Sequence, residues 1–201
     1  MIHEILSYGI DSNSFVIEDN VNILIDCGTG LNTNVWDFLR KREIEIDILI
    51  NTHCHIDHIG GNRFFEDVKI YAHELDAPDI ERGTPKTVAH MIYPNFSGFK
   101  VTKRMREGDL IKTDSHILEV LHTPGHTEGS LSLYDLQEKI LFSGDTVFHM
   151  GIGRMDFPSG SEIDMKKSLQ RLCEFEIEKI YPGHGQLTTK ESLEMVLRFY
   201  F

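Results

Sequence analysis

Three imidazoles and one carboxylate lie within a six-residue stretch of this chain, at His53, His55, Asp57 and His58. Neutral imidazole and carboxylate groups are preferred ligands of zinc and similar divalent metals. His53 and His55 are two residues apart, so on an extended segment their side chains point the same way, whereas Asp57 and His58 face elsewhere. This spacing suggests two neighbouring metal positions. The alternative is a histidine-rich loop that holds no metal.

The histidine cluster directly follows an apolar run, residues 46–50, which predicts a buried strand leading into a loop at its carboxyl end. Three later residues of ligand type show the same order of an apolar run, a turn that contains glycine, and then the side chain. They are His126 after residues 117–121, Asp145 after residues 139–142, and His184 after residues 178–181. Each alone is better explained as a turn residue, but four strand ends of this kind predict one shared site.

These motifs, in this order, resemble the metallo-β-lactamase superfamily and, within it, the glyoxalase II-like hydrolases. The residues that carry the resemblance are His53-Cys54-His55-Ile56-Asp57-His58, Thr123-Pro124-Gly125-His126-Thr127, Gly144-Asp145-Thr146, residues 151–156 and Pro182-Gly183-His184-Gly185, within a span of residues 23–184. The resemblance implies two divalent metal ions, with zinc as the first expectation and iron or manganese as alternatives. It implies that His53, His55 and His126 hold the first ion, that Asp57, His58 and His184 hold the second, and that Asp145 bridges both.

The resemblance also implies the four-layer αβ/βα sandwich of that superfamily, whereas periodicity alone indicates only a mixed α/β (α+β) protein. We expect a single metallo-β-lactamase-fold domain over residues 1–201. The pattern predicts strands at 2–8, 14–18, 21–26, 47–51, 68–72, 115–121, 130–135, 139–142 and 177–181, and helices at 34–42, 161–174 and 190–200. Residues 80–99 show no clean period and predict a loop or short-helix insertion near the site. Tyr93, Phe96 and Phe99 there either line a substrate pocket or pack on the core.

The expected activity follows from metal chemistry, because a divalent ion lowers the pKa of bound water from near 16 to about 7. Two ions that share one hydroxide would supply a nucleophile for an acyl carbonyl, and Asp57 is the expected catalytic residue that orients it or moves protons. The leading hypothesis is a metal-dependent hydrolase that uses this hydroxide to cleave a small thioester or related acyl ester; a lactonase is a variant. The alternatives are an oxidoreductase resembling the persulfide dioxygenases, which use one iron, and a non-catalytic metal-binding protein.

Substrate choice rests on Arg154, which matches a basic residue that contacts the thiol carrier in glyoxalase II. The resemblance is incomplete here, because Asp156 replaces a tyrosine that contacts glutathione, and Gly185-Gln186 replaces Glu-Tyr. The matched region also lacks the family's carboxyl-terminal helical domain, so we do not expect this chain to recognise glutathione as those enzymes do. Alternatively, Arg154 and Asp156 form an ion pair that fixes the loop beside Asp145.

The composition of the chain restricts the classes of partner that we expect it to bind. The chain has 20 basic and 32 acidic residues and a formal net charge of −12, which disfavours nucleic acid and leaves a small-molecule acyl substrate as the expected partner. We expect no membrane segment and a cytoplasmic protein, because the first residues carry neither a basic region nor a long apolar stretch. The aromatic residues at 197–201 are expected to dock on the core, and the alternative is that they dock on another copy of the chain in a homo-oligomer.

Smaller expectations concern single residues. The three cysteines are too few for a disulfide framework, and Cys54 is expected to point away from the neighbouring histidines. Asp26 either hydrogen-bonds close to the site or has a turn or cap role. His73 and His90 have no motif around them and are expected at the surface.

Overall fold

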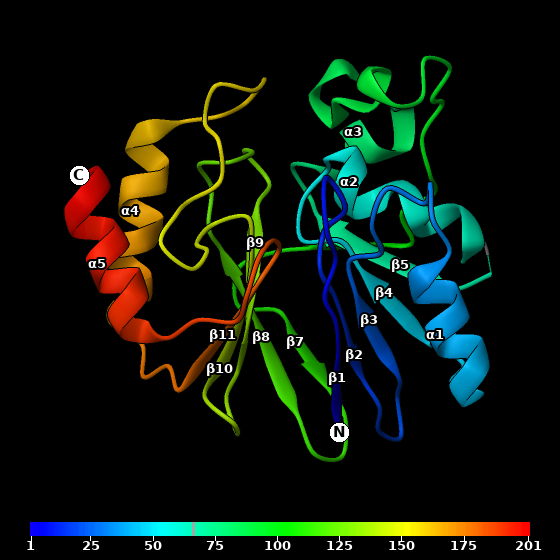
Figure 1. Ribbon diagram of the computed structural model, residues 1–201, viewed down its shortest axis with the longest axis horizontal. Helices are drawn as coiled ribbons and strands as arrows, with labels where there is room; N and C mark the ends of the chain where they lie inside the picture. The colour runs from blue at the N-terminus through cyan, green and yellow to red at the C-terminus, as the bar shows by residue number, and fades with distance from the viewer. Residues whose placement is uncertain (66) are drawn as a thin grey trace.

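The computed structural model describes residues 1–65 and 67–201, which form two β-sheets with helices on their outer faces (Figure 1). The first sheet contains β1 (Ile2–Ile5), β2 (Ser14–Ile17), β3 (Ile23–Ile25), β4 (Ile48–Ile50), β5 (Lys69–His73) and β6 (Lys103–Met105), in that order. The second contains β11 (Lys179–Pro182), β10 (Ile140–Gly144), β9 (Leu131–Asp135), β8 (Ile117–His122) and β7 (Leu110–Lys112). The helices are α1 (Asn34–Arg42), α2 (Ile56–Ile59), α3 (Ala77–Arg82), α4 (Glu162–Leu172) and α5 (Lys190–Tyr200), with 3₁₀ turns η1 (Gly60–Phe64), η2 (Pro85–Thr87) and η3 (Ala89–Met91).

Alternation along each strand creates the layers, because successive side chains point to opposite faces of a sheet. In β2, Phe15 and Ile17 enter the core between the sheets, whereas Val16 packs outward with Leu39 of α1. In the second sheet, Leu141 of β10 likewise faces α4 and α5. Figure 1 shows α4 and α5 on one side, α1 on the other and the strands between them. The predicted four-layer αβ/βα sandwich is therefore confirmed.

The local sequence explains where the longer helices begin and end. Helix α1 has the predicted bounds and ends at Glu43, which adopts a left-handed conformation with φ of 56°. Helix α4 begins after Ser161, whose hydroxyl accepts a hydrogen bond from the backbone N–H of Asp164 over 3.3 Å. Helix α5 has the predicted bounds, and α4 is shorter than predicted at both ends.

The strand directions bring the predicted site residues together. Strands β3 and β4 are parallel, and so are β10 and β11. The carboxyl ends of parallel neighbours lie at the same edge of a sheet, so the loops after these strands converge. Within the described residues, no helix is both long enough and apolar enough to cross a membrane.

Candidate metal centre

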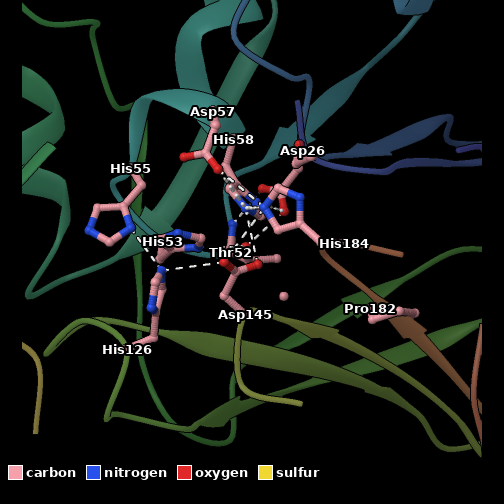
Figure 2. A network of polar contacts seen from close by, with 12 residues as sticks. Asp26, Thr52, His53, His55, Asp57, His58, His126, Asp145, Pro182 and His184 are labelled. Atoms are coloured by element: carbon pink, nitrogen blue, oxygen red, sulfur yellow. Dashed lines mark hydrogen bonds and ion pairs between the residues drawn. The ribbon is translucent and has the colours of Figure 1, made fainter. Parts of the chain in front are cut away.

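The first group of the centre consists of His53, His55 and His126, all of them buried. Nδ1 of His55 lies 2.8 Å from Nε2 of His126, and the rings of His53 and His126 have their centroids 4.7 Å apart. Figure 2 shows the two loop histidines, which follow β4, and His126, which follows β8, turned toward one another. Three imidazole nitrogens can therefore reach a common point.

The second group consists of Asp57, His58 and His184, on the other side of His53. Nε2 of His184 lies 3.1 Å from Oδ2 of Asp57 and 3.3 Å from Nε2 of His58. His58 is fully buried, whereas Asp57 and His184 keep about a quarter of their side-chain surface exposed. This group is the more open of the two.

Asp145 lies between the two groups. Its Oδ1 is 3.1 Å from Nε2 of His58, and its Oδ2 is 3.4 Å from Nε2 of His126 and 3.7 Å from Nε2 of His184. One carboxylate is thus within 4 Å of histidines of both groups. The structure brings together all seven residues predicted as ligands, in the two groups that the resemblance implied.

Some buried polar atoms of this cluster have no hydrogen-bond partner among the described protein atoms. Among the described residues, Nε2 of His53 and Oδ1 of Asp145 are buried and have no hydrogen-bond partner. A buried polar atom without a partner is costly, so these atoms fit a cation far better than an empty space. Burial and the neighbouring imidazole of His126 lower the pKa of His55 to about 3, which keeps that ring in the neutral form that binds metal. The donor set and its unpaired atoms therefore fit two divalent ions.

The hydrogen-bond network also indicates which ring nitrogen carries the proton in His126 and in His53. Nδ1 of His126 donates to the backbone carbonyl of Arg154 over 2.6 Å, which leaves the lone pair on Nε2. Thr52 donates its hydroxyl proton to Oδ2 of Asp26 over 2.7 Å, so its oxygen accepts from Nδ1 of His53 at 3.2 Å. The Nε2 atoms of both histidines are thus free to face the centre.

Asp26 has a larger role than the sequence indicated. It follows β3, has a positive φ of 55°, and accepts hydrogen bonds from the backbone N–H of Thr52 and from Nδ1 of His58. The first of the two alternatives for Asp26, a hydrogen bond close to the site, is therefore confirmed. Thr52 was not singled out from sequence; its position directly before the first histidine was the only available signal.

A cleft of about 460 Å³ opens beside the centre, and its lining includes Asp57, Asp145 and His184. The 80–99 insertion contributes Val88, Met91 and Ile92 to this lining. The insertion contains the end of α3 and the two short turns η2 and η3, followed by a loop, as predicted, and it does border the site.

The three aromatic residues of the insertion, in contrast, do not line this cleft. Tyr93, Phe96 and Phe99 pack against the buried apolar cluster that includes Ile59 and Ile80. Of the two alternatives, packing on the core is the correct one for these rings.

Arg154 also lines the cleft, but its guanidinium is already paired. It donates from Nε to Oδ1 of Asp156 over 2.9 Å and from Nη2 to Oδ2 over 2.7 Å. The guanidinium also lies over the ring of Phe157, with its central carbon 4.2 Å from the ring centroid. The predicted ion pair between Arg154 and Asp156 is confirmed.

The remaining expectations for single residues, Cys54, His73 and His90, had different outcomes. Cys54 is fully buried in an apolar cluster, its Sγ is 3.6 Å from the carbonyl of Lys86, and burial raises the pKa of its thiol, so it points away from the histidines as expected. The expectation that His73 lies at the surface was wrong. Its ring is buried and stacks on His122 with centroids 4.2 Å apart, a contact that a local pattern could not reveal. His90 is exposed as expected.

Comparison with known proteins places this geometry in a family. The family model described as the metallo-beta-lactamase superfamily matches residues 8–184. A protein named "Probable metallo-hydrolase MJ0888" from Methanocaldococcus jannaschii is 35% identical over 196 residues, which cover 93% of this chain and 94% of the relative. The hydroxyacylglutathione hydrolase GloC of Haemophilus influenzae is 28% identical, with 88% and 86% covered. The acyl-coenzyme A thioesterase MBLAC2 of Gallus gallus is 30% identical, with 86% and 71% covered.

Solved structures show the same fold. BLEG-1, a B3 metallo-beta-lactamase, superposes with a TM-score of 0.87 at 24% identity, covering 100% of this chain and 99% of the other. TTHA1623, solved in a di-iron-bound form, superposes with a TM-score of 0.82 at 26% identity, covering 98% and 99%. The chain is therefore a metallo-hydrolase that belongs to the metallo-beta-lactamase superfamily.

Proposed function

We propose that this metallo-hydrolase cleaves a small thioester or a related acyl ester. The observation that carries the proposal is the position of Asp145, whose carboxylate lies between the two groups of candidate ligands, 3.1 Å from His58 of one group and 3.4 Å from His126 of the other. The names of two relatives, a hydroxyacylglutathione hydrolase and an acyl-coenzyme A thioesterase, support acyl transfer to water as the reaction class.

We assign the ligands by the two groups that the structure brings together. His53, His55 and His126 would hold one divalent ion, Asp57, His58 and His184 would hold the other, and Asp145 would contact both. Zinc is the first expectation, and iron is the main alternative because TTHA1623 was solved with two irons. Two such ions supply a water of lowered pKa and polarise an acyl carbonyl oxygen.

Asp57 is the proposed proton-handling residue. Its carboxylate lines the cleft, 3.1 Å from Nε2 of His184, and it is one of the two more exposed members of the centre. Burial raises the pKa of this carboxyl, but the neighbouring His58 and His184 outweigh that effect and hold its pKa below the ordinary value. Asp57 is therefore ionised at neutral pH and able to accept a hydrogen bond from the attacking water.

The reaction balances without a further reactant. The oxygen of one water molecule forms a bond to the acyl carbon, and the bond from that carbon to sulfur breaks. One proton of the water passes to the departing thiolate, and the products are a carboxylic acid and a thiol. Arg154, at the edge of the same cleft, is the proposed contact for the part of the substrate that leaves.

Hydrolysis by metal-stripped and zinc-reloaded protein tests the proposal. Loss of the thioester absorbance of S-lactoylglutathione and of a simple acetyl thioester should require metal, and Asp57→Asn should lower kcat at least about 100-fold. Asp114→Asn changes an exposed carboxylate of the same type and should have no effect. Absence of turnover of both thioesters in protein that holds two metals would contradict the proposal. Consumption of oxygen with a persulfide by protein that holds one iron would instead indicate the dioxygenase alternative.

A further inference from the structure

Almost all polar side chains that line the cleft belong to the candidate metal centre. Among the described residues that line it, every polar side chain except Arg154 is a candidate ligand. Arg154 is held by Asp156 through two hydrogen bonds, so its charge is already compensated. A polar acyl group would therefore find few free partners in this cleft.

Apolar side chains form the remaining walls and flank the centre on both sides. The ring of Phe157 lies 5.5 Å from that of His55, and the ring of Phe148 lies 5.8 Å from that of His184. Ile152 lines the cleft as well. An acyl carbonyl placed at the centre would have its hydrocarbon chain in contact with one or both phenyl rings.

The cleft mouth also exposes large apolar side chains to water. Ile10, from the loop between β1 and β2, is 59% exposed, and Met91, at the end of η3, is 68% exposed. Both belong to the lining, so the apolar surface continues from the centre to the solvent. Exposed apolar surface that is continuous with a cleft is typical of a binding site for an apolar ligand.

We propose that the acyl group of the substrate is an apolar chain of several carbons. The cavity of about 460 Å³ is in the size range that holds a drug-sized ligand and is large for an acetyl or lactoyl group. Each methylene moved from water onto this lining should improve binding about two- to fourfold. The inference rests on the proposed function for the reaction, but the apolar contact can be measured separately.

A series of thioesters of N-acetylcysteamine, from acetyl to octanoyl, tests the inference with zinc-loaded protein. We expect kcat/KM to rise about two- to fourfold per methylene until the cleft is filled. A flat or falling series, with measurable metal-dependent turnover, would overturn the inference while the proposed function stands.

A binding measurement without turnover separates a failure of the acyl-chain inference from a failure of the proposed hydrolysis. Calorimetry of zinc-loaded protein with the matching S-alkyl thioethers, which cannot be hydrolysed, should show Kd falling with chain length and a negative heat-capacity change. If no thioester is hydrolysed, the proposed function fails, and this series alone decides the inference. Affinity that does not depend on chain length would overturn it.

A matched pair of variants locates the contact. Met91→Gln places an amide of similar size in the lining and should lower the octanoyl-to-acetyl ratio of kcat/KM about threefold. Met195→Gln makes the same change on α5, at a half-exposed methionine that is not part of the lining, and should leave the ratio unchanged. An unchanged ratio in Met91→Gln, together with a flat thioether series, would place the acyl chain elsewhere.

Discussion

Nδ1 of His58 donates a hydrogen bond to Oδ2 of Asp26 over 2.8 Å, and both side chains are buried. In the neutral, metal-binding form of His58 this bond keeps the proton on Nδ1 and leaves the lone pair on Nε2, which lies 3.1 Å from Oδ1 of Asp145. Through the hydroxyl of Thr52, the same carboxylate also orients His53. One residue that is not a candidate ligand thus positions a histidine in each half of the centre.

Asp26→Asn should lower metal affinity about 10- to 100-fold, the usual range for such partners of ligating histidines. An amide nitrogen facing His58 would favour the wrong tautomer of the ring, with the proton on Nε2. Competition with a chromogenic chelator measures the affinity. Asp114→Asn, at an exposed position, is the control. Unchanged affinity in Asp26→Asn would remove the positioning role.

Gly183→Ala should eliminate activity through a steric effect beside the centre. A Cβ at this position would lie 2.2 Å from Oδ1 of Asp145 and 2.8 Å from Cε1 of His58, so both side chains would have to move. The metal content of the variant should fall, with activity. Gly151→Ala is the matched control, because its nearest neighbour, the ring of Phe148, is 3.8 Å away. Full metal content and activity in Gly183→Ala would contradict the geometry.

Asp76→Ala should destabilise the fold by about 3 kcal/mol or more. The buried carboxylate accepts hydrogen bonds from the backbone N–H groups of Cys54 and Gly129 and from the hydroxyl of Thr127. Each buried donor left without a partner costs about 1 to 3 kcal/mol. Urea unfolding at neutral pH measures the change, and the exposed Asp114→Ala should be neutral. A loss below about 1 kcal/mol would show that water replaces the carboxylate.

His73 should make the metal-stripped protein less stable as the pH falls. Burial, together with the neighbouring His122, lowers the pKa of His73 to about 4, although Glu74 and Glu107 oppose the shift. The unfolded chain takes up this proton near pH 6.5, so the stability is fully present above pH 6.5 and is lost as the pH falls toward 4.

His73→Asn should reduce this loss, by at most about 1.4 kcal/mol per pH unit, the limit for one proton. Urea unfolding of wild type and variant across pH 7.5 to 4.5 measures the difference. His90→Asn, at an exposed histidine, should follow the wild type. Parallel pH curves for His73→Asn and wild type would contradict the low pKa of His73.

The strands, the longer helices and the positions of the candidate ligands could be predicted because each has a local pattern in the sequence. The candidate ligands lie in four segments that each follow an apolar strand, and the helix at 34–42 has a clear period and clear ends. The family resemblance then supplied the way the two sheets face each other.

Contacts between distant residues could not be predicted from such patterns. The bond between Asp26 and His58 joins residues 32 positions apart, and His73 stacks on His122 from a different sheet. Between β6 and β7 the chain passes from one sheet to the other within a few residues, and alternation does not show which sheet a strand joins. In the 80–99 insertion, the side chains that line the cleft are aliphatic rather than the more conspicuous aromatic ones.

Metal stoichiometry tests the two-metal centre most directly. Metal-stripped protein titrated with zinc in a calorimeter, with bound metal confirmed by elemental analysis, should take up about two equivalents. Asp145→Ala should weaken both sites, whereas Asp57→Ala should weaken the second site alone, because Asp57 belongs to only one group. Binding of a single equivalent by the wild type, unchanged in Asp57→Ala, would contradict the two-metal centre and the hydrolytic mechanism built on it.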